Sequence, residues 1–375
     1  MMLRFIYGGE MGKVFNIIQF LKEAVNAGAS DEHLMVGYPP YVRINGFIQK
    51  TVYPSLTKEQ LDDAILEIVP TAIRDVILTL CDVDFMYEIK GCSRFRVNYN
   101  RQLGMPALVI RNISYNIPKL KELSLPNALN NIVKQPNGIV LVTGPTGSGK
   151  STTIASLIDE INQTEARHIV TIEDPIEYVF ESVKSIVSQR QVEVDTKSFA
   201  DGIKYSLRQD PDVIFIGEIR DKETMSAALK AAETGHLVLS TLHTNDAIQT
   251  INRVVNMFEE SNRPIIRKQL ADTLRATIAQ KLVYSNKMKK RYPACEVMVV
   301  TSTIKDYLNK DNTDAIYDIL RDSNIDDMVT MNDSLARLVQ ADLISQEEAL
   351  EHSNDVSELD KIFRGVYQGT KSYYE

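Results

Sequence analysis

Cysteine is scarce in this sequence, with three residues among 375, scattered at positions 81, 92 and 295. An odd number without a CxxC pair argues against a disulfide framework and a zinc ribbon, and it favours a reducing compartment. Long apolar runs are also missing, because no stretch approaches the ~20 residues that span a bilayer. Residues 1–15 lack the apolar core and cleavage site of a signal peptide. We therefore expect a cytoplasmic protein with no direct insertion into a membrane.

Positive charge is in deficit as well. The chain has 42 Lys and Arg residues against 50 Asp and Glu, a net charge of −8. Binding nucleic acid without regard to sequence needs a basic face that neutralises phosphates, so we expect no nucleic-acid partner. Apolar residues make up 44% of the chain, which at this length is enough for the cores of two domains.

The first third of the chain alternates short helices and strands. Apolar spacing predicts a helix within residues 14–28 that stops at a glycine, and Asn45-Gly46 predicts a hairpin within 41–53. Thr57 and Gln60 form the capping box of a second helix. Three strands are expected between residues 82 and 113. We interpret residues 1–113 as an α+β domain and the polar, Pro-punctuated segment 114–126 as a linker.

From Gly138 the pattern becomes strand, loop and helix in repetition. The short apolar strands are GIVLVT, HIVTIE, DVIFIGE and HLVLSTL, with helical segments between them. Continuous apolar strands separated by helices predict a parallel sheet covered on both faces. This α/β core is expected over residues 127–264. After Pro264 we predict a mostly helical region, 265–375, in which ADTLRATIAQKLV and MNDSLARLVQADLISQEEALEH form amphipathic helices.

A phosphate-binding loop follows the strand GIVLVT and opens a helix. The sequence GPTGSGKST satisfies GxxxxGK[ST] in the strand–loop–helix context that the motif requires, which argues against a chance Gly-rich turn. Backbone N–H groups and the helix N-terminus would surround the phosphates. Lys150 would reach the β- and γ-phosphates, and the Ser151 hydroxyl would hold Mg²⁺. The predicted ligands are ATP and Mg²⁺, and the predicted binding residues are Gly144, Pro145, Thr146, Gly147, Ser148, Gly149, Lys150, Ser151 and Thr152.

Two strands end in carboxylates that such a site needs. The stretch TIEDPIEY brings Glu173, Asp174 and Glu177, and DPDVIFIGEIRD brings Glu218 just beyond four apolar residues and a glycine. A carboxylate at the end of a buried strand supports the metal, and another residue orients the attacking water. The alternative is that these are solvated loop acids, as most Asp and Glu are. Two acidic strand ends beside one phosphate loop favour the functional interpretation.

With these motifs in place, the chain resembles the secretion ATPase superfamily that drives type II secretion, type IV pili and related machines. GPTGSGKST, TIEDPIEY, LRQDPDVIFIGEIRD and ETGHLVLSTLHTND match its Walker A, Asp box, Walker B and His box at family spacing. The resemblance covers nearly the whole chain. It implies a PAS-like N-terminal domain joined to a RecA-like ATPase domain, assembled as a homo-hexameric ring. It also implies that Glu177 is the catalytic glutamate and that Glu218 is the Walker-B glutamate, which supports the metal together with Ser151.

Two of the five histidines, His236 and His243, flank the strand HLVLSTL. Their H-x6-H spacing without a nearby third ligand argues against zinc. Carboxyl ends of parallel strands face the ligand crevice, so we expect His243 on the nucleotide side, where it could sense the γ-phosphate. The resemblance implies that both histidines serve ATP-linked motion. A purely structural role stays open for His236.

Arginines lie on the neighbouring strands predicted between residues 94 and 111. Alternation places Arg94 and Arg96 on one strand face. Exposed arginines usually do no more than solvate a surface. The resemblance favours instead a role for Arg96, Arg101 and Arg111 at a neighbouring subunit's nucleotide, without deciding among them, since trans arginines stabilise charge in phosphoryl transfer.

Within the superfamily, three stretches look like the pilus-retraction branch: VGYPPYVRING, SFADGIKYSLRQDPD and MNDSLARLVQADLIS. The sequences GEIRD and LSTLHTND are closer to those of assembly ATPases. Two departures stand out. STIKDYLNK (Ser302–Lys310) replaces an AIRNLIRE-like helix and lacks its arginines, and Glu32 stands where the family prefers an apolar residue.

The resemblance thus implies an ATPase motor for pilus retraction at the cytoplasmic face of the inner membrane. Its expected partners are an inner-membrane pilus platform protein and a paralogous pilus ATPase. A pilus-assembly or type II secretion ATPase, and a nucleotide-bound regulatory paralogue of the main motor, are the alternatives.

Overall fold

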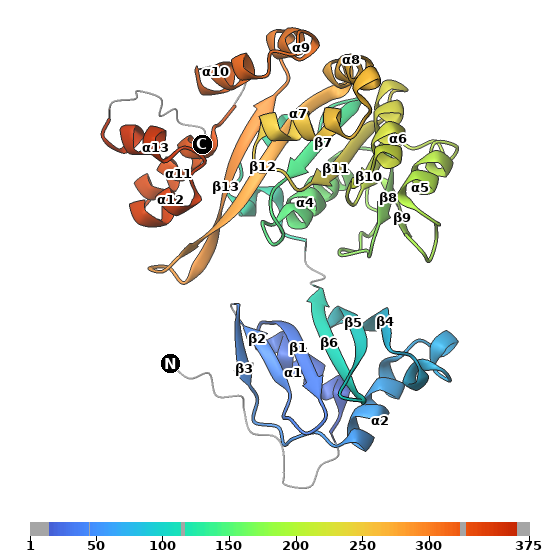
Figure 1. The fold of residues 1–375 in the computed structure, drawn as a ribbon. Coiled ribbons are helices and arrows are strands. Elements are labelled where there is room, and N and C mark those ends of the chain that lie inside the picture. Colours follow the sequence, from blue (N-terminus) through green and yellow to red (C-terminus); the bar gives the residue numbers. More distant parts are fainter. Residues whose placement is uncertain (1–14, 45, 114–116, 323–327, 366–375) are drawn as a thin grey trace. The chain divides into compact units, whose positions relative to one another are not determined.

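The computed structural model describes residues 15–44, 46–113, 117–322 and 328–365, and the chain divides into two compact units, Met1–Asn116 and Ile117–Glu375 (Figure 1). The segment expected to lack a signal peptide lies outside these ranges, apart from its last residue. So do Asn45 of the expected hairpin and residues 114–116 of the expected linker. Within the described ranges, none of the helices combines the length and the apolar character needed to cross a membrane.

The first unit is an antiparallel sheet with helices packed on its apolar face. Its described strands run in the order β3-β2-β1-β6-β5-β4, and all their pairings are antiparallel. The expected hairpin, capping box and three consecutive strands are confirmed. The elements are α1 (Ile17–Asn26), β1 (Ala29–Met35), β2 (Tyr41–Ile44), β3 (Phe47–Lys50), α2 (Lys58–Ile68), the 3-10 turns η1 (Thr71–Ile73) and η2 (Ile77–Thr79), β4 (Asp82–Ile89), β5 (Ser93–Gln102) and β6 (Met105–Ile113).

Strict alternation explains this sheet. Along β5, Phe95, Val97 and Tyr99 are buried against the two helices, while the residues between them point to the other face. Glu32 breaks the pattern, because it lies on the core face of β1 and is fully buried. Burial raises the pKa of Glu32 to about 8, against a hydrogen bond from Asn112 that lowers it.

The described strands of the second unit form a seven-stranded sheet in the order β13-β12-β7-β11-β10-β8-β9. All neighbours are parallel except β12 and β13, which form an antiparallel hairpin. The elements are η3 (Leu120–Leu123), α3 (Ala128–Ile132), β7 (Gly138–Thr143), α4 (Lys150–Thr164), β8 (His168–Glu173), β9 (Ile186–Gln191), α5 (Phe199–Ser206), β10 (Val213–Ile216), α6 (Lys222–Glu233), β11 (Leu237–Leu242), α7 (Ala247–Asn256), η4 (Glu260–Asn262), α8 (Arg263–Thr273), β12 (Leu274–Ser285), β13 (Lys290–Val299), α9 (Ser302–Asn309), α10 (Asp314–Asp322), α11 (Met331–Gln340), α12 (Gln346–His352) and α13 (Val356–Phe363).

Helices cover both faces of this sheet, as predicted (Figure 1). Alternate residues of the interior strand β7 belong to different cores. Ile139 and Leu141 pack with α6, α7 and α8, whereas Val140 and Val142 pack with α3 and α4. This two-sided burial is the reason that the strands read as continuous apolar runs.

The prediction of a mostly helical region after Pro264 is wrong for residues 274–299. Most of ADTLRATIAQKLV forms strand β12, which pairs with β7 and with β13. Residues Ala276–Gln280 are buried in succession, so the segment lacks the alternation of a half-buried strand, and its apolar spacing also fits a helix. The helices expected further on are present as α9, α11 and α12.

The expected linker 114–126 is shorter than predicted. Leu120 and Leu125 are buried with α3 and α4, and the Ser156 hydroxyl of α4 donates a hydrogen bond to the Pro118 carbonyl (2.6 Å). The described part of the segment therefore packs on the second unit. Its prolines and charges suggested a loop, but the two leucines anchor it.

Candidate active site

The phosphate loop connects β7 to α4 and depends on glycines at two close approaches. At Gly144, which has φ 141°, a Cβ atom would lie 2.2 Å from the Gln280 carbonyl oxygen of β12. At Gly149, with φ 89°, it would lie 2.8 Å from the Gln280 amide nitrogen. The side-chain oxygen of Gln280 also accepts a hydrogen bond from the Thr153 hydroxyl (2.7 Å). Only residues without a side chain let the loop pack this tightly against β12.

The loop has the polar groups that a phosphate needs. The Lys150 ammonium group donates to the carbonyls of Gly144 and Pro145 (2.8 and 3.0 Å), so it lies inside the loop. The Ser148 hydroxyl is buried without a hydrogen-bond partner among the described residues. Burial lowers the pKa of Lys150, while the charges of Glu218 and Glu177 oppose that shift. An orphan hydroxyl, a lysine and a helix N-terminus fit a phosphate group.

Both predicted carboxylates lie at the edge of the sheet where the phosphate loop lies. Glu177 follows β8 and Glu218 follows β10, and the parallel strands β7, β11, β10 and β8 are consecutive neighbours in the sheet. The Asp box also touches the loop directly, because the Tyr178 hydroxyl lies 3.0 Å from the Thr152 hydroxyl. Glu177 is exposed and Glu218 half-buried, which leaves Glu177 accessible to water.

His243 is brought to the same edge. It follows β11, and its Nε2 atom lies 3.5 Å from a carboxylate oxygen of Glu218. The other carboxylate oxygen of Glu218 pairs with Arg220. Glu218 thus contacts a group from its own strand's loop and a group from the neighbouring strand's loop. Any movement of Glu218 toward a metal ion would change both contacts.

The structure does not bring His236 to this site. It precedes β11, at the opposite end of a six-residue strand from His243, which corresponds to roughly 20 Å along the chain. Its Nδ1 atom lies 2.9 Å from the Ala231 carbonyl, at the C-terminus of helix α6. The grouping of His236 with the catalytic residues is therefore not supported within the subunit, since its contacts are those of a helix cap.

The arginines of the first unit are engaged within their own unit. The Arg111 side chain donates to Asp31 (2.9 Å), and Arg96 lies 3.7 Å from Asp84. Arg96 and Arg111 are register partners in the half of the β5–β6 pair away from the hairpin turn. Arg101 is separated from them, because it lies near the hairpin turn and donates to the Leu78 and Gly104 carbonyls.

Gln280 belongs to the site although none of the sequence motifs contains it. The residue is 3% exposed, and its side chain joins β12 to the first turn of α4, the helix that the phosphate loop opens. A buried amide within an apolar strand is a usable signal, since buried polar groups need partners. If the segment is assigned to a helix, however, the position of Gln280 beside the phosphate loop cannot be predicted from this signal.

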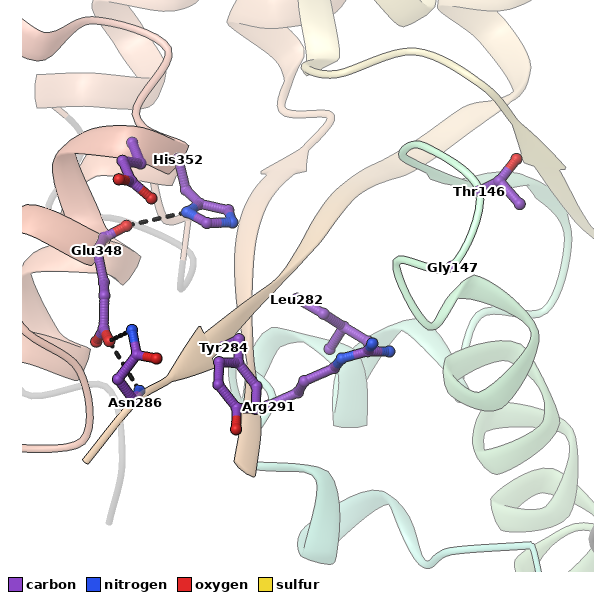
Figure 2. Close-up of a pocket in the computed structure, with 9 residues that line it drawn as sticks. Thr146, Gly147, Leu282, Tyr284, Asn286, Arg291, Glu348 and His352 are labelled. Carbon is purple, nitrogen blue, oxygen red and sulfur yellow. Dashed lines mark hydrogen bonds between the residues drawn. The ribbon is translucent and has the colours of Figure 1, made fainter. Parts of the chain in front are cut away.

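A cavity of about 470 Å³ opens beside the tip of the phosphate loop (Figure 2). Thr146 and Gly147 form one wall, and the β12–β13 hairpin with helix α12 forms the rest. In Figure 2, Arg291 lies on the side nearer the loop, while Glu348 lies on the far side. The amide and backbone N–H groups of Asn286 each donate to Glu348 (2.8 Å), which connects the hairpin to α12. The hairpin thus brings a polar surface next to the predicted phosphate site.

The second unit has the architecture of a RecA-like ATPase domain. It is a mixed α/β unit that brings a phosphate loop, two strand-end carboxylates and a histidine to one edge of its sheet. The family described as Type II/IV secretion system protein matches residues 82–375, and the chain belongs to this family. ATP hydrolysis is the activity of that superfamily.

The similarity extends over nearly the full length of individual relatives. The type IV pilus retraction ATPase PilT of Pseudomonas aeruginosa is 40% identical over 90% of this chain and 97% of its own. The type IV pilus ATPase PilU of the same organism is 35% identical over 91% and 89%. A crystal structure of the pilus retraction motor PilT with bound ADP superposes with a TM-score of 0.86, at 42% identity over 92% and 99%.

Proposed function

We propose that this protein is a homo-hexameric, Mg²⁺-dependent ATPase motor that powers retraction of a type IV pilus. The observation that carries the proposal is the gathering of Lys150, Glu177, Glu218 and His243 at one sheet edge, in a chain similar over nearly its whole length to pilus retraction ATPases. A loop that binds phosphates, beside an accessible carboxylate, suits hydrolysis of a γ-phosphate by water.

In this proposal Glu177 is the general base. Its exposed carboxylate orients the attacking water and takes up its proton. Lys150 leaves the loop carbonyls that it now contacts and pairs with the β- and γ-phosphates. Glu218, together with the Ser151 hydroxyl, would hold a Mg²⁺ ion, which would supply positive charge beside the phosphates.

His243 connects hydrolysis to motion. It lies next to Glu218 and directly precedes the segment that opens helix α7, where Asp246 caps the helix. A change in the charge held near Glu218 alters the contact with His243 and so the position of that segment. Rigid-body movement between the two units is the proposed mechanical output.

The assembled ring completes the site in this proposal. One or more of Arg96, Arg101 and Arg111 from a neighbouring subunit stabilises the transition state in trans, which is worth ~10³–10⁵ in rate for arginine fingers. Specific activity should then fall as the protein is diluted and the ring dissociates. Activity that stays proportional to protein concentration down to the monomer would exclude catalysis in trans.

The motor works at the cytoplasmic face of the inner membrane, held there by an inner-membrane pilus platform protein. A paralogous pilus ATPase is a second proposed partner. The composition of helix α9 favours this second partner, because the helix stands in place of the AIRNLIRE-like helix and carries no arginine. Buried Ile304 and Leu308 attach it to the core, and Lys305 pairs with Asp272 of α8 (2.6 Å).

The test is the number of surface pili in cells carrying Glu177→Gln, compared with a deletion of the gene and with wild type. More or longer pili in both mutant strains would support retraction. Bald cells would mean that the motor assembles pili, and pili like those of wild type would mean that a partner ATPase suffices. The purified variant must also lose ATP hydrolysis while keeping ADP binding, because a regulatory paralogue would show little hydrolysis even as wild type.

A further inference from the structure

The loop that carries Glu177 is held by one amide side chain outside the family motifs used above. Gln189 lies on β9, in register with Thr171 of β8. Its amide nitrogen donates to the Tyr178 carbonyl (2.7 Å) and to the Glu173 carboxylate (3.2 Å). Its amide oxygen accepts a hydrogen bond from the Phe180 N–H (2.9 Å). One side chain therefore uses both its donor and its acceptor capacity on the segment Glu173–Phe180.

Glu173 holds the other side of the same loop. The residue is 5% exposed, and its carboxylate accepts hydrogen bonds from the Thr171 hydroxyl (2.6 Å), from Gln189 and from the backbone N–H of Glu177. Burial raises the pKa of Glu173 to about 7, although these hydrogen bonds lower it. Glu173 thus touches the Glu177 backbone directly and depends on Gln189 for one of its partners.

Hydrogen bonds consequently hold the backbone on both sides of Glu177. On its N-terminal side the Glu177 N–H meets Glu173, and on its C-terminal side Gln189 binds the next carbonyl and the N–H two residues further on. The Tyr178 hydroxyl lies 3.0 Å from the Thr152 hydroxyl in the first turn of α4, directly after the phosphate loop. The Glu177 side chain itself is exposed. The distance from its carboxylate to the phosphates is therefore set by the backbone that these bonds hold.

We propose that Gln189 is a positioning residue for Glu177, acting through Glu173 and the carbonyl of Tyr178 to fix the loop relative to the phosphate loop. This inference rests on the proposed role of Glu177 as general base. A catalytic group displaced by about 1 Å can lose ~10²-fold in rate. Gln189 should therefore matter for the chemical step and little for nucleotide binding, which depends on the phosphate loop.

The experiment is Gln189→Leu in the full-length enzyme, with kcat and KM for ATP hydrolysis and the Kd for ADP measured side by side. We expect kcat to fall about 10- to 100-fold, while the Kd for ADP changes less than about twofold. Gln191→Leu is the matched control, since it lies on the same face of β9 and bonds to Asp195 through its backbone N–H and C=O. Gln191→Leu should leave kcat within about twofold of wild type.

Gln189→Glu is the second variant, because it keeps the size of the side chain and the acceptor for Phe180 while losing the donor when ionised. It should also lower kcat and spare the Kd. An unchanged kcat in both variants would overturn the proposal. So would a loss of ADP affinity by the same factor as kcat, because that pattern indicates general damage to the fold.

A double-mutant cycle separates this inference from the role of Glu177. If Gln189 acts only through Glu177, adding Gln189→Leu should not reduce the residual kcat of Glu177→Gln any further. Multiplicative effects would contradict positioning. If Glu177→Gln by itself keeps the wild-type kcat, the assignment of the general base fails. If Glu177→Gln lowers kcat to a measurable residual rate and Gln189→Leu by itself keeps the wild-type kcat, the inference about Gln189 alone fails.

Discussion

The two units of this protein place their charged side chains in opposite ways. In the second unit, parallel strands all end at one edge of the sheet, so Lys150, Glu177, Glu218 and His243 gather there from four separate segments. In the first unit, antiparallel strands reverse direction at each turn, and the arginines spread along the sheet. Parallel order concentrates polar groups at one site, whereas antiparallel order distributes them over a face.

The units also differ in how they treat a buried carboxyl group. Glu173 in the second unit has a hydroxyl, an amide and a backbone N–H as partners. Glu32 in the first unit has Asn112, and its second carboxyl oxygen is buried without a hydrogen-bond partner among the described residues. An unsatisfied buried oxygen costs stability when it is charged. The comparison indicates that hydrogen bonds hold the Glu173 side chain in place, whereas the buried carboxyl group of Glu32 destabilises the core of the first unit.

Lys150→Ala removes a residue from the polar site at the edge of the parallel sheet, and it should have the largest effect on ATP hydrolysis. Removing the ammonium group takes away the cation that, in the proposed function, pairs with the β- and γ-phosphates, so we expect hydrolysis to fall at least about 100-fold, with weaker ADP binding. The measurement is steady-state ATP hydrolysis together with ADP titration. Lys230→Ala, on the exposed last turn of α6, is the control and should leave both unchanged. Equal losses in the two variants would point to unfolding.

Glu32→Gln tests the buried acid of the first unit through pH. The native pKa of Glu32 is about 8 and its ordinary value is 4.5, so the native state keeps the proton where the unfolded chain has lost it. Its contribution to stability is complete below about pH 4.5 and is lost as the pH rises through about 8. In wild type the free energy of unfolding of this unit should fall by up to about 1.4 kcal/mol per pH unit in that window. Glu32→Gln should flatten the slope.

Hydrogen exchange of the β1 and β6 amides, corrected for intrinsic rates, measures this dependence in the first unit alone. That restriction matters because the second unit has its own buried acids, with the pKa values of both Glu173 and Glu296 raised to about 7. Asp31→Asn is the comparison variant: the charge of Asp31 is one cause of the raised pKa of Glu32, so the variant should keep the slope and narrow its pH window. Burial raises the pKa of Asp31, but hydrogen bonds from Arg111 and Ser30 outweigh this effect and hold it below its ordinary value. Its contribution is therefore lost only at lower pH. Identical slopes for wild type and Glu32→Gln would refute the assignment.

The two histidines compare the two ends of strand β11, because His236 precedes the strand and His243 follows it. The expected loss of ATP hydrolysis is smaller than for Lys150→Ala. His243→Ala removes a group that contacts Glu218, and we expect ATP hydrolysis to fall about tenfold. His236→Ala removes a helix-capping contact, so it should cost about 0.5–1.5 kcal/mol of stability and leave hydrolysis within about twofold. Urea unfolding and steady-state hydrolysis, measured on both variants, give the answer. A larger loss of hydrolysis from His236→Ala would show that its end of the strand takes part in catalysis.

Several elements could be predicted from the sequence because their signals are local. The capping box of Thr57 and Gln60, the hairpin between β2 and β3, and the phosphate loop each depend on neighbours a few residues apart. Strand β12 cannot be told from a helix by its sequence pattern, because a strand buried on both faces lacks the alternation that distinguishes the two. The contribution of Gln280 to the site was consequently out of reach, since this residue gains its meaning only when β12 pairs with β7.

The sequence by itself determined the chemistry of this protein. A glycine-rich loop between a strand and a helix, followed by strands that end in acids, specifies phosphate binding through the backbone and the residue types alone. Only the tertiary structure decided which polar groups meet. The tertiary structure places His243 beside Glu218 and His236 beside the C-terminus of α6. It also brings the Gln189 side chain into hydrogen-bonding contact with the loop that carries Glu177. Those contacts join residues distant in sequence, so they depend on strand order and register, which no local pattern encodes.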